Sequence, residues 1–289
     1  MSYDRVFMPS SRRDTAVRIA RAATLHAAQF AVRKLEPAAA RSANGAGPAG
    51  PENEPDIYES LYEAHAQSQG DETVVGDLSL APIEREIVQD AGLKPNQTLL
   101  DLGCGIGRLA CEVIPWMQDG GGYIGTDVSE SMLTRAEQRV AAVVPSPACS
   151  VRWIKQVGRS FPLEPNSVDM FCAFSVFTHI EQEDAYGFLC EARRVVCPDG
   201  RFVFSCLPME LSDSRFLFHG SAQMDVTARW NTIRNVTTSV DMMNLISNMA
   251  GWEPVSWTPG NRERFGQSVC VLKPLADEVL AARPNAWEL

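Results

Sequence analysis

From residue 57 onward, short apolar runs alternate with segments in which apolar residues recur at helical spacing. The runs predict strands at 97–103, 122–127, 151–154, 168–175, 201–206, 252–257 and 267–273. The helical spacing predicts helices at 82–92, from Ser129 onward, around 185–192 before a turn at 198–200, and over a last segment with Met242, Leu245, Ile246 and Met249 on one side. Strands and helices in alternation are typical of the α/β class, with a doubly wound, mostly parallel sheet.

The first 56 residues have a different pattern. Residues 14–35 are rich in good helix formers and lack Pro and Gly, which predicts a helical arm over 1–36. Its apolar residues do not gather on one face, so we expect a packing or oligomerisation helix. Membrane association of the arm and a targeting presequence are the lesser alternatives. The Pro- and Gly-rich stretch 37–56 is expected to be a flexible linker, 57–274 the main domain, and 275–289 a tail.

Composition narrows the class of protein. The 289 residues are 45% hydrophobic and 21% charged, which excludes wholesale disorder. The net charge is −10, with a net basic N-terminal stretch and a strongly acidic remainder, so we expect no nucleic-acid partner. No apolar run approaches the ~18 residues of a spanning helix, and no secretory h-region opens the chain, so we expect a cytoplasmic protein. The 8 cysteines lack C-x₂₋₄-C spacing, so neither a metal site nor a disulfide framework is expected.

The strongest chemical signal is a glycine-rich loop after the first predicted strand. Asp101, Gly103, Gly105 and Gly107 lie between that strand and a helical run, and Asp127 ends the next strand twenty residues later. Glycines let a ligand approach the backbone, and a carboxylate at the end of the next strand, here Asp127, can bind ribose hydroxyls. The pattern is G-x-G-x-G rather than the dinucleotide G-x-G-x-x-G, and Asp101 would repel a diphosphate but attract an ammonium group. The residues therefore favour S-adenosyl-L-methionine over NAD as the adenosine ligand.

At these positions the sequence resembles class I S-adenosylmethionine-dependent methyltransferases. LLDLGCGIGRLA (99–110), YIGTDVSESML (123–133), FPLEPNSVDMFCAFSVFTHI (161–180) and EARRVVCPDGRFVFS (191–205) are similar to that family's segments, in the same order. The resemblance implies a Rossmann-like sheet of seven strands in the order 3-2-1-4-5-7-6, with an antiparallel last strand.

The same resemblance implies roles for individual residues. Asp101 and Gly103 would face the methionine moiety, and Gly105 and Gly107 would shape the loop. Asp127 would hold the ribose, Val128 and Met132 would flank the adenine, and Ser175 would lie where the fourth strand opens toward cofactor and substrate. Relatives often carry an acid that reads the adenine amino group, and this chain aligns Val157 there, between Gln156 and Gly158. Either Gln156 or backbone groups, with Gly158 counted in the pocket, replace that contact, or the alignment is displaced by one residue.

His179, just after the fourth predicted strand, is the candidate catalytic residue. It could act as the general base for a hydroxyl acceptor, or it could be structural and fix its loop to a neighbouring carbonyl. Residues 207–239 form a predicted insertion or lid that mixes aromatic residues with arginines, and it is interpreted as an acceptor pocket or a dimer contact.

The combined interpretation is a methyltransferase, for which we expect O-methylation of a small-molecule or glycan hydroxyl. N-methylation, a protein acceptor, and a catalytically idle S-adenosylmethionine-binding module remain alternatives, and an NAD-dependent oxidoreductase is the least favoured. The sequence decides neither the acceptor nor the oligomeric state.

Overall fold

The computed structural model describes residues 60–61, 78–156, 158–230, 233–276 and 279. The predicted arm (1–36), the linker (37–56) and most of the tail (275–289) lie outside these residues. Strands occupy β1 (Thr98–Leu102), β2 (Gly122–Asp127), β3 (Ser150–Lys155), β4 (Val168–Ala173), β5 (Val196–Cys206), β6 (Trp252–Thr258) and β7 (Ser268–Pro274). Helices occupy η2 (Leu78–Leu80), α3 (Ala81–Asp90), α4 (Ala110–Val113), α5 (Glu130–Val143), α6 (Gln182–Val195), α7 (Ser212–Ala222), α8 (Val226–Trp230) and α9 (Val240–Met249).

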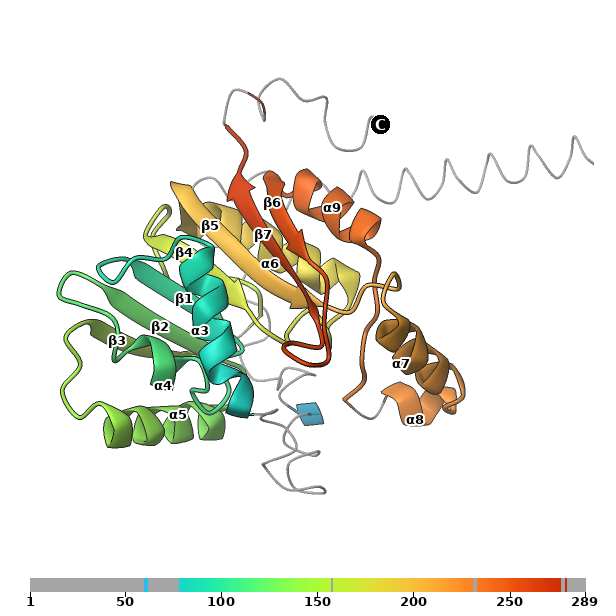
Figure 1. The fold of residues 1–289 in the computed structure, drawn as a ribbon, viewed down its shortest axis with the longest axis horizontal. Helices are drawn as coiled ribbons and strands as arrows, with labels where there is room; N and C mark the ends of the chain where they lie inside the picture. The colour runs from blue at the N-terminus through green and yellow to red at the C-terminus, as the bar shows by residue number, and fades with distance from the viewer. Residues whose placement is uncertain (1–59, 62–77, 157, 231–232, 277–278, 280–289) are drawn as a thin grey trace, which may run out of the picture. The chain divides into compact units, whose positions relative to one another are not determined.

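The described strands form a seven-stranded sheet in the order β3-β2-β1-β4-β5-β7-β6 (Figure 1). The pairs from β3 through β5 are parallel, and β7 runs antiparallel to both β5 and β6. The expected doubly wound α/β architecture and its antiparallel last strand are therefore confirmed. The sheet separates two apolar layers because side chains alternate between its faces.

One layer packs α6 and α9 against the sheet, and the other packs α3, α4 and α5 against the opposite face. In Figure 1, α3 crosses in front of the sheet and α6 lies behind it. Trp252 of β6 is fully buried in the first layer, where its indole Nε1 donates to Leu189 O at 2.8 Å. This bond satisfies the polar atom of a large core side chain and fixes α6 to the sheet.

Two local expectations were wrong. The turn expected at 198–200 lies within β5, because the β4–β5 register shifts between Val168 and Met170 and the extra residues form a bulge. The last helix buries Met243, Ile246 and Ser247, whereas Met242 is 43% exposed and Leu245 is 52% exposed. The apolar residues of this helix cover more than one face, so the spacing alone predicted the wrong face as the buried one.

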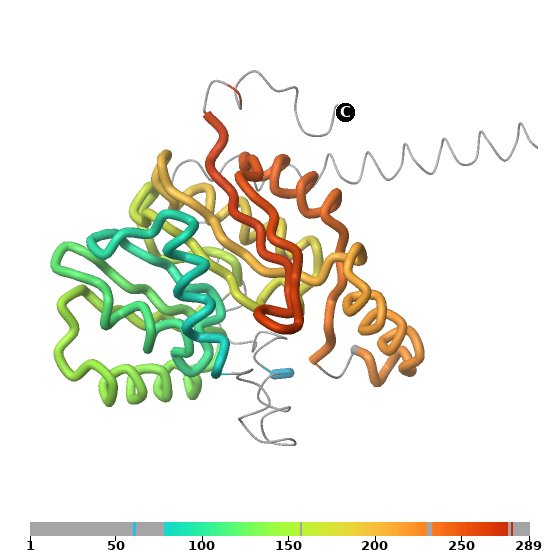
Figure 2. The backbone as a smooth tube through the Cα atoms, in the orientation of Figure 1, coloured from blue at the N-terminus to red at the C-terminus, as the bar shows by residue number. Residues whose placement is uncertain are grey.

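The chain between β5 and α9 leaves the two packed layers. Figure 2 shows it passing through α7 and α8 at the side of the sheet before it returns to α9. The only buried residue of α7 is Ser214, and Phe216 and Phe218 are exposed by 73% and 51%. The returning end of the insertion pairs with its outgoing end, since Pro208 and Thr238 form a parallel bridge. The predicted insertion therefore consists of two peripheral helices on a fixed base.

Candidate functional site

The loop after β1 lies where the strand order reverses. β2 and β4 pair with β1 on its two sides, so the carboxyl ends of the three strands meet at one edge of the sheet. In open α/β sheets this position is where ligands bind. The topology thus brings the glycine loop, Asp127 and Ser175 to the same edge, as the sequence predicted.

The three glycines of the loop have positive φ angles but different neighbours. A Cβ atom on Gly103 would lie 2.6 Å from Val176 Cγ2, and one on Gly107 would lie 3.2 Å from the Cα and Cβ atoms of Ala136. Gly105, at φ +53°, has no atom of the described residues within 4 Å of that position. Gly103 and Gly107 therefore let the loop pack closely on its neighbours, whereas Gly105 faces open space that a ligand can enter.

Asp127 connects the loop to α5. Its Oδ2 accepts from the Gly105 N–H at 2.9 Å, and its Oδ1 accepts from the Ser129 N–H at 2.9 Å. Ser129 is the predicted N-cap and accepts from the Met132 N–H. The Asp127 carboxylate is half-buried, Val128 beside it is half-buried, and Met132 is buried. A negative charge is thereby held next to the open space at Gly105.

Asp101 differs from the expectation of a carboxylate directly open to a ligand. It is only 3% exposed, and its oxygens accept from the Tyr123 hydroxyl at 2.6 Å and from the Cys172 thiol at 3.5 Å. The reason is strand alternation, because Leu100 and Leu102 face the α6 layer and Asp101 must face the other one. Burial raises the pKa of Asp101 to about 6 against the opposing effect of these hydrogen bonds.

Glu84 of α3 was not predicted as part of the site. Its carboxylate is 1% exposed and accepts from Arg108 Nε at 2.9 Å, with a second contact to Arg108 Nη2. Burial raises the pKa of Glu84 to about 7, opposed by the Arg108 charge and reinforced by the Asp101 charge. One sequence signal could have revealed it, since Glu84 shares a helix face with Val88 four positions later.

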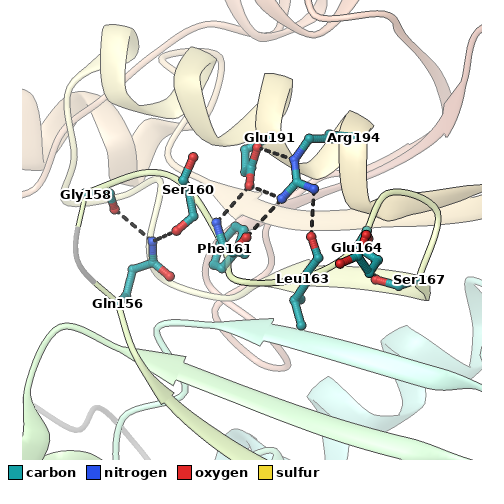
Figure 3. Close-up of polar contacts among 9 residues, drawn as sticks. All are labelled: Gln156, Gly158, Ser160, Phe161, Leu163, Glu164, Ser167, Glu191 and Arg194. Carbon is teal, nitrogen blue, oxygen red and sulfur yellow. Dashed lines mark hydrogen bonds and ion pairs between the residues drawn. The ribbon is translucent and has the colours of Figure 1, made fainter. Parts of the chain in front are cut away.

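Gln156 lies beyond β3, beside Asp127, whose backbone carbonyl accepts from the Gln156 N–H at 2.8 Å. Its side-chain Nε2 donates to Gly158 O at 2.9 Å and to Ser160 O at 3.1 Å (Figure 3). These carbonyls identify the amide nitrogen, and the buried Oε1 has no hydrogen-bond partner among the described residues. Val157 lies outside the described residues. Gly158 is exposed at φ +66°, with open space at its Cβ position.

The segment after Gln156 is fastened to α6 by a charged pair. Arg194 donates to Leu163 O at 2.7 Å and to Phe161 O at 3.0 Å, and Glu191 accepts from the Phe161 N–H at 2.8 Å (Figure 3). Glu191 and Arg194 also pair with each other on one helix face. Backbone groups between β3 and β4 are thus satisfied without regular structure, which fixes the position of Gln156.

Ser175 follows β4 with a φ of +59°, an unusual angle for a residue other than glycine. Its N–H donates to Ser205 Oγ at 2.8 Å, and its Oγ accepts from Gln267 Nε2 at 2.8 Å. The Ser205 hydroxyl donates to Gln267 Oε1 at 2.6 Å. Strained backbone held by surrounding bonds is typical of functional positions.

His179 is linked to the returning part of the insertion. Its Nδ1 lies 2.9 Å from Arg234 O, and because a carbonyl only accepts, Nδ1 carries the proton. The Arg234 guanidinium pairs with Glu181, and the Val236 N–H donates to Thr178 O at 2.7 Å. Burial lowers the pKa of His179 below 6.5, so its ring is neutral at pH 7. A structural link and a general base remain two open interpretations.

The sheet order, the glycine loop after β1 and the acid after β2 together define the class I methyltransferase fold. Residues 100–204 match the family model described as a methyltransferase domain. Residues 100–204 are thus similar to a methyltransferase domain, and the cofactor of the class I enzymes that share this fold is S-adenosyl-L-methionine.

Curated relatives align with part of this chain. A 2-phytyl-1,4-naphtoquinone methyltransferase of Trichormus variabilis is 34% identical over 38% of the chain and 46% of the relative. A demethylmenaquinone methyltransferase of Symbiobacterium thermophilum is 31% identical over 47% and 52%. A sterol 24-C-methyltransferase of Gibberella zeae is 26% identical over 52% and 38%. The chain therefore spans only about half the length of these relatives, or less.

A solved structure has the same fold. The magnesium protoporphyrin IX methyltransferase of Synechocystis, with bound SAH, superposes with a TM-score of 0.58 at 16% identity, covering 76% of this chain and all of that one. No helix within the described ranges is long and apolar enough to cross a membrane. Over the same ranges, no three His, Cys, Asp or Glu side chains cluster as metal ligands would.

Proposed function

We propose that this protein is an S-adenosylmethionine-dependent methyltransferase that acts on a small molecule. The observation that carries the proposal is the open space at Gly105, bordered by the half-buried carboxylate of Asp127. A side chain at Gly105 would fill this space, so the backbone there suits close approach by a ligand. The match of residues 100–204 to a methyltransferase domain supports the same proposal.

The residues at the edge fit the proposed cofactor. Asp127 would hold the ribose hydroxyls, and Gly103 and Gly105 would lie along the ligand. Asp101 would contribute its charge from within the sheet, since its oxygens already accept from Tyr123 and Cys172. When bound, S-adenosylmethionine supplies an electrophilic methyl group on a sulfonium. The chain's own contribution is alignment of an acceptor, worth up to ~7–11 kcal/mol in favourable cases.

For the acceptor we propose a hydroxyl of a small molecule or glycan, with His179 as the base. Its Nδ1 proton is committed to Arg234 O, so Nε2 is the nitrogen that would take the hydroxyl proton. The acceptor oxygen would form the new bond to the methyl carbon while the sulfur–carbon bond breaks and its electron pair stays on sulfur. The lowered pKa of His179 keeps the ring in the accepting form at neutral pH.

A second candidate is methylation at carbon on a lipophilic ring compound. It is favoured by the names of the curated relatives, which include a sterol 24-C-methyltransferase, a 2-phytyl-1,4-naphtoquinone methyltransferase and a demethylmenaquinone methyltransferase. The exposed Phe216 and Phe218 on α7 also suit an apolar acceptor.

Isothermal titration calorimetry tests the cofactor assignment. We expect binding of S-adenosylhomocysteine and no binding of NADH. Asp127→Asn should weaken S-adenosylhomocysteine at least about tenfold, since hydrogen bonds to a charged group contribute about 1.5–3 kcal/mol. The matched control is Asp119→Asn, an exposed aspartate in the turn before β2. Binding of NADH in place of S-adenosylhomocysteine would contradict the assignment.

The acceptor is tested with ¹³C-methyl-labelled S-adenosylmethionine and a deproteinised extract of the source cells. We expect one labelled small molecule, and the carbon shift of its methyl group distinguishes a bond to oxygen from a bond to carbon. Cofactor binding without any labelled product would identify an idle binding module instead.

A further inference from the structure

Three polar side chains close a hydrogen-bonded ring at the carboxyl ends of β4 and β5. Ser175 follows β4, Ser205 lies in β5, and Gln267 directly precedes β7, which pairs antiparallel with β5. The three contacts are 2.6 to 2.8 Å long. The sequence singled out Ser175 alone, because the ring joins positions up to 92 residues apart.

The buried Ser205 fixes the direction of every proton in this ring. Ser205 is fully buried, and its Oγ accepts from the Ser175 N–H while its own proton goes to Gln267 Oε1. With the Gln267 amide turned over, its nitrogen would also donate to Ser205 Oγ, and the Ser205 proton would lose its acceptor. A buried donor without a partner is strongly unfavourable, so the observed orientation is the stable one.

The Ser175 hydroxyl is left as an outward-facing donor. Its Oγ already accepts from Gln267 Nε2, so its own proton must be directed away from the ring. Ser175 is half-buried, and the ring helps to hold its strained backbone at a φ of +59°. Val176, the next residue, lies against the glycine loop, where a Cβ on Gly103 would approach it to 2.6 Å. The donor thus lies beside the loop.

We propose that the Ser175 hydroxyl binds an oxygen atom of the methyl acceptor, a carbonyl or a hydroxyl that becomes an oxyanion, and that Ser205 and Gln267 are positioning residues for it. The inference rests on the proposed function and names its acceptor subsite. Asp127 marks the nucleoside side at β2, and Ser175 lies at β4, across β1 from it. The ring continues farther from Asp127, to β5 and β7, which places the donor on the acceptor side of the loop.

Two variants remove the donor in different ways. Ser175→Ala deletes the hydroxyl but keeps the N–H bond to Ser205. Gln267→Glu preserves the shape of residue 267 but replaces the donating amide by a carboxylate that only accepts, so the Ser175 proton turns inward. Ser256→Ala, at an exposed position of β6, is the matched control. Thermal unfolding of all three variants verifies that they are folded.

Two measurements distinguish an effect on acceptor binding from an effect on cofactor binding. Initial rates of labelled methyl transfer against dilutions of the deproteinised extract give an apparent KM and kcat, and calorimetry gives the Kd of S-adenosylhomocysteine. We expect both ring variants to lower kcat/KM for the acceptor about 10- to 100-fold, the span of one hydrogen bond to a charged group, with the Kd within twofold of wild type.

A weakened Kd with unchanged acceptor KM would overturn the inference, because the donor would then serve the cofactor's carboxylate. Unchanged values of both would overturn it as well. A wild-type protein that binds no S-adenosylhomocysteine would instead refute the proposed function, which distinguishes the two failures.

Discussion

Asp101 and Asp127 lie near the ends of neighbouring strands, yet their carboxylates differ in burial and in hydrogen-bond partners. Asp127 is half-buried and accepts two backbone N–H bonds, which stabilise its ionised form. Asp101 is buried with Tyr123 and Cys172 as hydrogen-bond partners, and its charge interacts with that of the buried Glu84. At the residue scale, burial therefore makes the charge of Asp101 unfavourable, whereas the half-buried carboxylate of Asp127 borders the open space at Gly105.

The first prediction concerns how Asp101 makes the free energy of unfolding depend on pH. Its pKa is raised from 3.8 to about 6 in the folded protein, so between these values the folded state binds a proton that the unfolded state has released. The stability that this proton provides is complete below about pH 4 and is lost as the pH rises to 6. Asp101→Asn should therefore remove this slope and raise the unfolding free energy at pH 7 by about 1–3 kcal/mol.

Urea denaturation of both proteins at pH 4.5, 6 and 7.5 measures this difference. The same substitution should weaken the binding of S-adenosylhomocysteine, because it removes a negative charge that would attract the ligand's ammonium group from within the sheet. Unchanged affinity in Asp101→Asn would mean that Asp101 is a structural residue only.

The second prediction separates two glycines of one loop. Gly105→Ala and Gly107→Ala both place a side chain at positive φ, which costs roughly 1–2 kcal/mol each. Gly107→Ala also forces its Cβ to 3.2 Å from Ala136, so it should lose a further ~1–3 kcal/mol of stability. Gly105→Ala should be the more stable variant but should lose at least about tenfold in S-adenosylhomocysteine affinity, since its Cβ enters the open space.

Thermal unfolding and calorimetry of the two variants provide the comparison. Equal stability losses would contradict the packing argument, and retained affinity in Gly105→Ala would place the ligand elsewhere.

At the scale of elements, the loop after β4 and the return of the insertion form one unit. His179 bonds to Arg234 O, Arg234 pairs with Glu181, and the Val236 N–H donates to Thr178 O. These contacts hold the loop after β4 against the returning segment of the insertion. The same contacts are compatible with two roles of His179, as a general base and as a structural link between the loop and the insertion.

The third prediction distinguishes these two interpretations of His179. His179→Asn places an amide N–H near the position of Nδ1 and can keep the bond to Arg234 O, but it cannot accept a proton at neutral pH. If His179 is the base, His179→Asn and His179→Ala should both lower kcat by about 10²–10⁴ with S-adenosylhomocysteine affinity retained. In wild type, kcat should fall at low pH with an apparent pKa below 6.5, because burial lowers the pKa of this histidine.

Steady-state rates and a pH profile of the three proteins decide the matter. A His179→Asn variant within about threefold of wild type, beside an impaired His179→Ala, would assign His179 to the structural link.

Across the described part of the molecule, the packed core and the peripheral helices are separate parts. The two layers on the sheet contain the buried apolar side chains, and α7 contributes only Ser214 to the interior. Residues 226–228 of α8 are exposed. We therefore expect that changes in these peripheral helices leave the sheet edge intact.

The fourth prediction is that α7 and α8 are dispensable for folding but not for acceptor recognition. Replacing residues 212–230 with about eight Gly and Ser residues, which span roughly 16 Å on average, should change the unfolding free energy little. The Kd of S-adenosylhomocysteine should stay within about threefold, and labelled methyl transfer to the extract should be lost. Calorimetry, urea denaturation and the labelling assay check these points, and retained transfer would assign the two helices a different role.

Local patterns sufficed for much of the fold. The strand ending at Asp127 and the N-cap at Ser129 were predicted directly, because apolar runs and capping residues act over a few neighbouring positions. The strand order came from the resemblance to a family, because spacing within one chain does not reveal which parallel strands pair.

What the sequence by itself determined is the set of elements, the glycine loop and the acids that follow two strands. Only the tertiary structure decided that Asp101 points into the sheet, that Glu84 is buried against Arg108, and that Ser175, Ser205 and Gln267 meet. The physical reason is that burial and hydrogen bonding depend on which faces pack together. These contacts join residues 24 to 92 positions apart, whose proximity no local pattern records.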